Sequence, residues 1–309
     1  MCLPAKPTSA GTSKTVIFIR HAESRWNRAK RNKNVVQMFA RRDHPLTPTG
    51  YAQALALAAA VGAASGAGAP LSTEQASAVS NLPALAAIGG AQVVWASPLT
   101  RAVQTALVGL APLLSRDGGP QLLLKPIIRE RKNLFGKDTL GVARGVGCGE
   151  RALGELRKLG MSDSDADAVQ GVLARSDASE TSARWWTRTR DRNADVERRA
   201  DALLAAIEAT PHETIVVVGH SLLLRVVFRR CQMSSLPDGD GAQASLRVEK
   251  LPNCGAACCT LAFDGAGDGG ATITRAAVVD VRPLMTAGGG AGGAKAHRSR
   301  KSSSRVAPA

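Results

Sequence analysis

The chain has 309 residues, of which 44% are hydrophobic, and a formal net charge of +15. This length suffices for one large α/β domain or two small ones, and the apolar content supports a sizeable core. No apolar run reaches the roughly 18–20 residues that a membrane-spanning helix needs. The segment before Thr15 lacks the apolar core of a signal peptide. We therefore expect a cytoplasmic protein without membrane insertion.

The positive charge is compatible with nucleic acid, anionic membranes or anionic metabolites as partners. Aromatic residues are only 3% of the chain, too few for the stacking platforms that bind single-stranded nucleic acid. Residues 287–309 are Gly-rich and then basic, which predicts a disordered tail. A second group of basic residues, between 25 and 42, fits a solvated face and a substrate-attracting rim equally well.

The six cysteines do not form a metal-binding pattern. Only Cys254, Cys258 and Cys259 lie close together, and no second Cys or His pair stands nearby at zinc-binding spacing. We predict reduced structural thiols and no metal site.

Residues 15–19 form a short run rich in β-branched residues, which predicts a buried strand. The run ends in Arg20 and His21, and residues suited to a helix start follow. In an open α/β sheet, ligands bind just beyond the carboxyl ends of the strands. A cation beside an imidazole at that place suits an anionic substrate and an attacking nitrogen. Taken alone, however, such a pair is more often a solvated Arg and a hydrogen-bonded His than a catalytic one.

Residues 43–50 predict a turn that leads into an Ala/Leu-rich helix over 51–61. Thr47 is placed as the N-cap of this helix, with a proline at its first position. The following stretch, about 62–90, is rich in Gly, Ala and Ser and predicts an insertion looped out of the fold.

Residues 91–96 predict a second strand, and Ser97 after it predicts an N-cap with a proline at the first helical position. The helix that would follow carries Arg101. A third apolar run, 121–128, ends close to Glu130 in a cluster of charged residues.

A helix is predicted around 150–159, whereas 163–182 is polar and carries no clear signal. Residues 184–209 show a long helical pattern, in which Trp185 and Trp186 are more simply explained by core packing than by cofactor binding.

Residues 214–218 predict a fourth strand, which His220 follows at once, and an apolar helix begins near Leu222. Two further strands, around 257–263 and 271–281, flank a Gly/Asp turn and predict a hairpin.

Strands that alternate with helices predict a three-layer α/β/α sandwich around a mostly parallel sheet of about six strands, in one domain over residues 1–286. Four strands end in polar or reactive residues, and a parallel sheet brings such ends to one edge. These residues are Arg20 with His21, Ser97 with Arg101, Glu130, and His220. The chain has only five histidines, and two of them occupy these positions.

Four motifs in this order resemble those of the histidine phosphatase superfamily, in its phosphoglycerate mutase-like branch. They are Arg20-His21-Ala22-Glu23-Ser24-x-Trp26-Asn27, the turn from Asp43 to Gly50, the stretch from Ser97 to Thr105, and Val217-Val218-Gly219-His220. Together they reach from Thr15 to about Phe228 and cover most of the predicted fold. One such motif would be weak, but four in order are specific.

The resemblance implies that His21 attacks a phosphoryl group and forms a phosphohistidine, which water later hydrolyses. Arg20 and Arg101 would each grip two phosphoryl oxygens, as a planar guanidinium can and an ammonium cannot. Asn27 and His220 would bind the same group. With so much fixed positive charge we expect neither a metal ion nor another cofactor to be needed.

The resemblance also implies that Glu130 protonates the leaving oxygen and then activates water, which requires a raised pKa. An ion pair of Glu130 with neighbouring cations is the alternative. Ala22 replaces the glycine usual in the family. The segment after Glu130 only partly matches the mutase pattern, and nothing in 141–149 suggests a seal that would protect a phosphoenzyme from water.

A phosphatase acting on a small phosphorylated metabolite is therefore the leading hypothesis. The alternatives are mutase-type phosphoryl transfer, and an inactive relative that binds phosphorylated partners. We expect no specific nucleic-acid binding, and only weak, salt-sensitive attraction through the basic tail. The sequence carries no signal for one substrate or for an oligomeric state.

Overall fold

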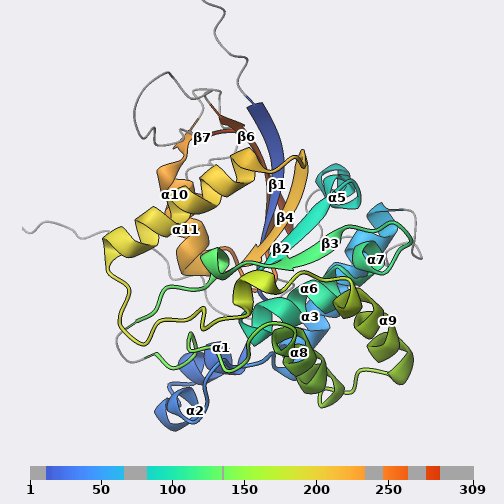
Figure 1. The fold of residues 1–309 in the computed structure, drawn as a ribbon, viewed down its shortest axis with the longest axis vertical. Helices are drawn as coiled ribbons and strands as arrows, with labels where there is room; N and C mark the ends of the chain where they lie inside the picture. The colour runs from blue at the N-terminus through green and yellow to red at the C-terminus, as the bar shows by residue number, and fades with distance from the viewer. Residues whose placement is uncertain (1–11, 66–81, 134–135, 234–245, 264–275, 286–309) are drawn as a thin grey trace, which may run out of the picture.

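The computed structural model describes residues 12–65, 82–133, 136–233, 246–263 and 276–285. In this part of the chain one sheet has seven strands in the order β3-β2-β4-β1-β6-β7-β5 (Figure 1). The strands are β1 (Thr12–Arg20), β2 (Val93–Ala96), β3 (Gln121–Leu124), β4 (Thr214–Gly219), β5 (Gln232–Met233), β6 (Ala256–Phe263) and β7 (Ala276–Met285). The four strands β3, β2, β4 and β1 run parallel to one another, whereas β6 pairs antiparallel with both β1 and β7.

Helices cover both faces of the sheet, so the predicted mixed α/β fold with a mostly parallel sheet is confirmed. The helices are α1 (Arg25–Arg31), α2 (Val35–Phe39), α3 (Pro48–Ala64), α5 (Leu82–Gly89), α6 (Thr100–Gly109), α7 (Ala111–Leu114), α8 (Gly147–Arg157), α9 (Asp163–Ala174), α10 (Asn193–Ala209) and α11 (Ser221–Arg230), with the short 3-10 turns η1 (Pro126–Ile128) and η2 (Ser179–Thr181). Figure 1 shows α10 and α11 on one face of the sheet and α3, α6 and α8 on the other. None of the helices in the described residues is both long and apolar enough to cross a bilayer.

Alternate residues of the central strands pack into two separate hydrophobic cores, one on each face of the sheet, because successive side chains of a strand point to opposite faces. Ile17 and Ile19 of β1 pack into the core that contains α3, α6 and α8. Val16 and Phe18 pack into the core under α10 and α11, where the Phe18 and Phe228 rings meet edge to face at 5.2 Å. Burial on both faces explains why β1 reads as a continuous apolar run rather than as an alternating one.

The strands predicted over 15–19, 91–96 and 214–218 correspond to β1, β2 and β4, and the predicted hairpin is the β6–β7 pair. The run 121–128 is a strand only as far as Leu124. A proline follows at position 126, and since proline has no N–H to continue the ladder, the chain turns into η1 there.

The segment predicted as a looped-out insertion is in part built into the fold. Helix α3 runs on to Ala64, and α5 places Leu85 and Ile88 in the core with no solvent exposure. Residues 66–81, which hold most of the Gly- and Ser-rich stretch, lie outside the described residues, as does the predicted tail over 287–309.

The helix predicted over 184–209 is wrong in its first part, because α10 begins only at Asn193. Trp185 is nevertheless buried, as predicted, but from an irregular segment where its Nε1 donates to the carbonyl of Ala143 at 3.0 Å. Trp185 and Trp186 extend the apolar pattern of the helix in the sequence, but in the structure both side chains pack on Gly141. The unassigned segment 163–182 contains α9, which Ser162 caps by accepting from the Asp165 N–H at 3.1 Å.

The turn over 43–50 forms as predicted and holds the first loop of the sheet edge in place. Thr47 caps α3 by accepting from the Gly50 N–H at 3.0 Å, and its own N–H donates to the Glu23 carbonyl at 3.0 Å. A Cβ on Gly50 would stand 2.0 Å from that Glu23 oxygen. The glycine of this motif is therefore needed for the close approach of two backbone segments.

We expect Gly50→Ala to lower the free energy of unfolding by about 3 kcal/mol or more, at the upper end of overpacking effects because the obstacle is backbone. Urea unfolding measures this loss. Gly154→Ala is the control: Gly154 lies inside α8 with open space around its Cα, so alanine should stabilise by about 0.5–1 kcal/mol. An equal effect of both variants would contradict the close-approach explanation.

Candidate active site

The carboxyl ends of β1, β4 and β2 bring three predicted residues together. The register pairs Arg20 with Gly219 and Ala96 with Val218, so that His21, His220 and Ser97 follow neighbouring strands at one edge. The imidazole centroids of His21 and His220 lie 5.0 Å apart. The gathering expected from a parallel sheet is thus present in the structure.

The hydrogen bonds of His21 fix its tautomer. Its Nδ1 lies 2.7 Å from the carbonyl oxygen of Ala22, which can only accept, so Nδ1 carries the proton. Nε2 then holds a lone pair and accepts from Arg101 Nε at 3.3 Å. Burial, together with the charges of Arg101 and Arg20, holds the pKa of His21 well below its usual 6.5. The ring is therefore neutral at physiological pH, with the lone pair on Nε2.

Arg101 comes from the first turn of α6 and is almost fully buried. Besides its contact with His21, its Nη1 donates to the Asp138 backbone oxygen at 2.8 Å, and Nη2 lies 3.6 Å from the Asp138 carboxylate. Arg20, at the end of β1, donates through Nη1 to the carbonyl of Leu251 at 2.7 Å. Both guanidinium groups are thus anchored by backbone carbonyls beside the imidazole of His21.

His220 is completely buried, and burial with the nearby cations holds its pKa well below 6.5. Its Nε2 pairs with Ser97 Oγ at 2.8 Å. Nδ1 is buried without a hydrogen-bond partner within the described residues. An unpaired polar atom at such depth is costly, and so a donor or acceptor of a ligand would satisfy it.

The prediction that Ser97 caps a helix is wrong. Helix α6 begins at Thr100, whose N–H and Oγ1 both donate to the Asp43 carboxylate, at 2.8 and 2.7 Å. A carboxylate from the distant turn therefore supplies the cap, and Ser97 is left to hold His220. Burial raises the pKa of Asp43 even though these hydrogen bonds oppose the shift.

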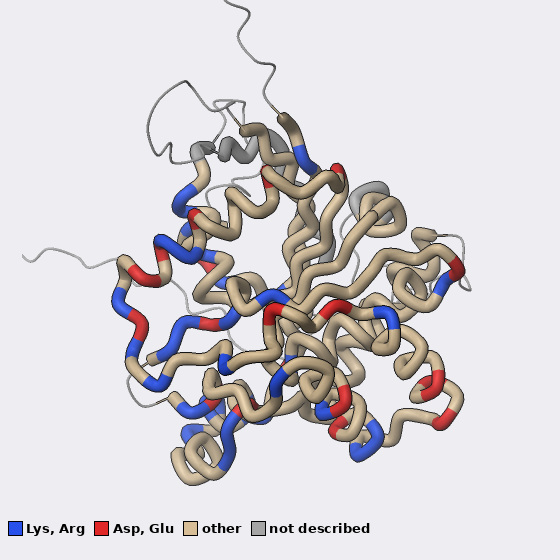
Figure 2. The backbone as a smooth tube through the Cα atoms, viewed as in Figure 1, with Lys and Arg blue, Asp and Glu red and all other residues tan. Residues whose placement is uncertain are grey.

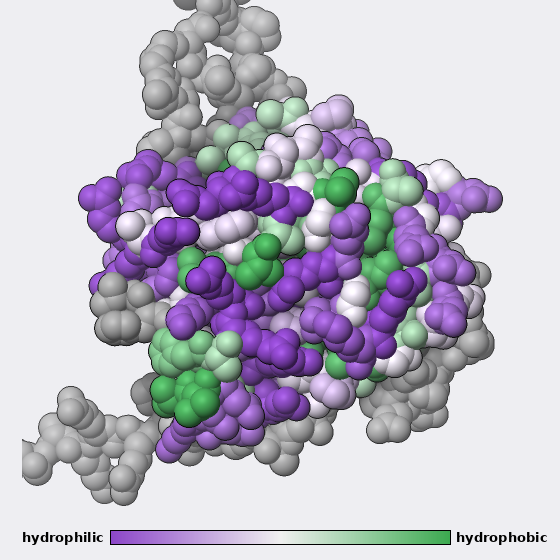
Figure 3. Space-filling model, turned by 60° about the horizontal axis from the view of Figure 1, so that its bottom comes forward, coloured by the Kyte–Doolittle hydropathy of each residue, from purple (hydrophilic) through white to green (hydrophobic). Residues whose placement is uncertain are grey.

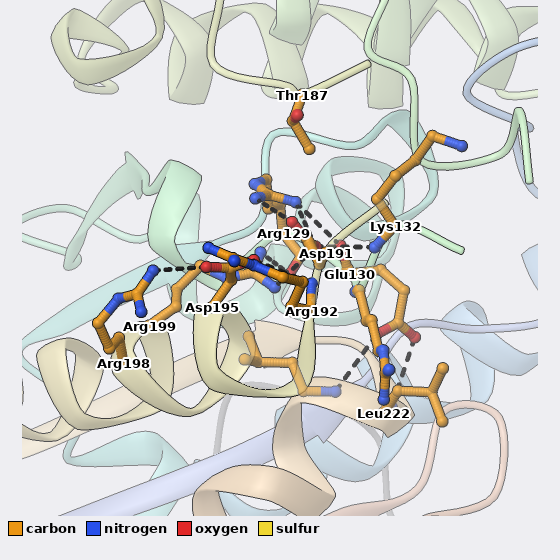
Figure 4. Close-up of polar contacts among 12 residues, drawn as sticks. Arg129, Glu130, Lys132, Thr187, Asp191, Arg192, Asp195, Arg198, Arg199 and Leu222 are labelled. Carbon is orange, nitrogen blue, oxygen red and sulfur yellow. Dashed lines mark hydrogen bonds and ion pairs between the residues drawn. The ribbon is translucent and has the colours of Figure 1, made fainter. Parts of the chain in front are cut away.

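Glu130 lies after η1 and reaches the N-terminus of α11 (Figure 4). Its Oε1 accepts from the N–H groups of Arg131 at 2.8 Å and Leu223 at 3.3 Å, and Oε2 accepts from Leu222 N–H at 3.4 Å. Burial raises the pKa of Glu130, against the opposing effects of these hydrogen bonds and of Arg101. The carboxyl group is placed beside the cations without forming the surface ion pair that was the alternative.

Asn27, on α1, uses its side-chain oxygen within the protein. The oxygen accepts from the N–H of Ser24 at 3.0 Å, its hydroxyl at 2.9 Å, and Asn253 Nδ2 at 3.2 Å. This leaves the Asn27 amide nitrogen as the group to offer a ligand. Asn253 also donates to the His21 carbonyl at 3.2 Å, a contact that the sequence did not signal.

These residues surround a cavity of about 450 Å³. Its lining comprises Arg20, His21, Trp26, Asn27, Lys30, Arg31, Arg101, Glu130, Asn133, Asp138, Ser221, Leu222, Lys250 and Asn253. All predicted site residues except His220 line it; His220 is fully buried next to His21, with the ring centroids 5.0 Å apart. In Figure 2 basic residues crowd the lower left, where α1 and the chain between α9 and α10 lie.

A buried ion network that the sequence did not reveal holds the segment carrying Glu130 (Figure 4). The Asp191 carboxylate accepts hydrogen bonds from both terminal nitrogens of Arg129, at 2.8 and 2.9 Å, and from the backbone N–H of Lys132 at 2.8 Å. Arg199 of α10 donates to the Arg129 carbonyl at 2.8 Å and to Asp191 at 3.3 Å. The backbone on both sides of Glu130 is thereby pinned, so Asp191 is a positioning residue for this carboxyl group.

We expect Asp191→Asn to slow hydrolysis of an alkyl phosphate by about tenfold or more, and that of nitrophenyl phosphate much less. The change removes the negative charge that holds Arg129 and Arg199, so the backbone around Glu130 becomes less well fixed. The predicted proton donation by Glu130 matters only for poor leaving groups, such as an alkyl alcohol. Steady-state kinetics with both substrates measures the split. Asp195→Asn, in the first turn of α10 and paired with the exposed Arg198, is the control. Equal losses on both substrates would point to general destabilisation instead.

The model of the histidine phosphatase superfamily, branch 1, matches residues 16–73, which contain the first two of the four motifs. A comparison with curated proteins gives no match. Among solved structures, phosphoglycerate mutase from Bacillus anthracis is similar at 17% identity, over 87% of this chain and 93% of that one, with a TM-score of 0.43.

Two phosphatase structures are similar to a comparable degree. For the ecdysone phosphate phosphatase of Bombix mori the identity is 17%, the coverage 80% of this chain and 88% of that one, and the TM-score 0.41. For the alpha-ribazole phosphatase of Shigella flexneri the identity is 15%, the coverage 88% and 96%, and the TM-score 0.38.

Proposed function

We propose that this protein is a histidine phosphatase, which hydrolyses phosphomonoesters of small metabolites through a phosphohistidine on His21. The observation that carries the proposal is the state of the His21 ring. Its proton is held on Nδ1 by the Ala22 carbonyl, and its lone pair on Nε2 accepts from a buried guanidinium beside a cavity lined by cations. A neutral, oriented imidazole next to fixed positive charge is what phosphoryl transfer to nitrogen requires.

In the first step, Nε2 of His21 attacks phosphorus and the bond to the leaving oxygen breaks. Protonated Glu130 gives its proton to that oxygen, so that a neutral alcohol departs. The raised pKa of Glu130 supports this role, because an ordinary carboxyl group would be ionised near neutral pH. The Nδ1–H group of His21 keeps its hydrogen bond to the Ala22 carbonyl, and this bond stabilises the positive charge that develops on the ring.

The phosphoryl oxygens are bound by Arg20, Arg101, Asn27 and His220 in this proposal. The unpaired Nδ1 of His220 supports its part: with Ser97 Oγ–H donating to Nε2, Nδ1–H is free to donate to a phosphoryl oxygen. Two guanidinium groups neutralise charge on the equatorial oxygens, as a metal ion does in other phosphoryl-transfer enzymes. The proposal therefore includes activity without an added metal.

In the second step, the Glu130 carboxylate takes a proton from water, and the water oxygen bonds to phosphorus. The P–N bond breaks, its electron pair returns to Nε2, and phosphate leaves. Glu130 ends protonated, and the site is ready for the next substrate.

The test is to trap the intermediate. Incubation with a phosphorus-labelled aryl phosphate and a rapid alkaline denaturing quench should leave label that resists base and is lost in acid, absent in His21→Asn. Phosphate release should continue in EDTA. Label without released phosphate, but with phosphoryl transfer to a second metabolite, would favour a mutase. Neither label nor release across a broad substrate panel would favour the inactive relative.

A further inference from the structure

While Glu130 is protonated, as the proposed first step requires, the cavity holds more positive charge than a phosphoryl dianion and the ionised carboxylates balance. Five cationic side chains line it, against the acidic Glu130 and Asp138. Arg101 is paired with Asp138, and Arg31 forms an ion pair with Glu23. The remaining cations are Arg20, Lys30 and Lys250.

The ammonium groups of two of these cations, Lys30 and Lys250, form no hydrogen bond or ion pair with any residue in the described part of the chain. Lys30 lies in the last turn of α1, three residues after Asn27, and residues at this spacing share a helix face. Lys250 directly precedes Leu251, whose carbonyl anchors Arg20. The two lysines therefore extend the walls of the cavity outward from the groups that would hold the phosphoryl oxygens.

The field at Lys250 shows how concentrated this charge is. Burial lowers the pKa of Lys250, and the charges of Lys30, Arg225 and Arg20 lower it further, with only Glu130 opposing. Like charges that repel one another across a cavity cost stability until an anion occupies the space between them. Figure 3, which turns the bottom of Figure 1 forward, shows a largely hydrophilic face around this edge of the sheet.

We propose that Lys30 and Lys250 bind a second anionic group of the substrate, a carboxylate or a further phosphate, a few atoms from the phosphoryl group. The inference rests on the proposed function for the place of the phosphoryl group. The substrate class is thus a small phosphomonoester with two anionic ends. Lysines suit this task because a flexible ammonium group can bind either kind of anion, whereas the planar, anchored guanidinium groups of Arg20 and Arg101 suit the reacting phosphoryl group.

Binding of two matched, unreactive probes tests the proposal. Propylphosphonate and 3-phosphonopropionate differ in a methyl group against a carboxylate at the end of the same chain. We expect calorimetry on the full chain to show at least tenfold tighter binding of 3-phosphonopropionate. The double variant Lys30→Met/Lys250→Met should reduce that advantage to threefold or less, with a smaller loss for propylphosphonate.

Lys33→Met is the control, because it removes one positive charge close to α1 without touching the cavity lining. It should keep the tenfold advantage. Equal affinity of the two probes, or an advantage that survives in the double variant, would overturn the proposal. Since neither probe is hydrolysed, this result is independent of catalysis: absence of a phosphoenzyme would refute the proposed function while the affinity ratio still decides the second anion site.

Discussion

Replacing Arg101 by lysine should lower kcat/KM for phosphomonoester hydrolysis by about 10²–10³, although the charge is retained. Arg101 makes three contacts from one planar group: Nε with His21 Nε2, Nη1 with the Asp138 carbonyl, and Nη2 with the Asp138 carboxylate. A lysine ammonium offers one point of charge and cannot meet the imidazole and the loop together. The site would keep much of its attraction for the substrate and lose the alignment of phosphorus with Nε2.

The loss should therefore fall mainly on kcat and on the rate of phosphoenzyme formation, with a smaller rise in KM. Single-turnover kinetics with a labelled aryl phosphate separates the two. Arg198→Lys is the matched control, since Arg198 is exposed on α10 and its ion pair is with Asp195, away from the cavity lining. A loss below tenfold would mean that charge alone, without the planar geometry, explains the role of Arg101.

The sheet and its reactive edge could be predicted because both depend on short-range patterns. An apolar, β-branched run ending in Arg20 and His21 is visible in the sequence, and parallel pairing then dictates that His220 stands beside it. The Thr47 cap was predictable for the same reason, since an N-cap bonds to residues within one turn of its own helix.

The errors come from contacts between distant segments. Ser97 has the local sequence of an N-cap, but Asp43 reaches the start of α6 first, and Ser97 pairs with His220 instead. In the same way, residues 184–192 carry a helical pattern, yet they lie outside α10, and Asp191 instead forms an ion pair with Arg129 from another segment. Such tertiary hydrogen bonds leave no periodic trace in the sequence.

The protonation state of Glu130 was also beyond the sequence. Its neighbours along the chain are cations, which favour the ionised form, but the fold buries the carboxyl group deeply enough to raise its pKa. Burial is set by α11, some ninety residues later in the chain, whose first N–H groups lie against the carboxyl oxygens. The same helix thus creates the site for the acid and limits how far its pKa rises.

Replacing Glu130 by glutamine should slow hydrolysis of an alkyl phosphate by about 10²–10⁴, the usual contribution of general acid catalysis. Hydrolysis of nitrophenyl phosphate should fall much less in its first step, because that leaving group departs without a proton. Glutamine keeps the size of the side chain and one oxygen that can accept from the Leu223 and Arg131 N–H groups, so only the 3.4 Å contact with the Leu222 N–H is lost.

The pH profile gives a second, independent measurement. Glu130 must be protonated to serve the leaving group, so kcat/KM for the alkyl phosphate should fall as pH rises through its raised pKa. His21 stays unprotonated to well below pH 6.5 and sets no acid limit above that value. In Glu130→Gln the alkaline decline should disappear, and a remaining low rate should be independent of pH in that range. A variant that loses equally on both leaving groups, or that keeps the alkaline decline, would assign the proton donation to another group or to water.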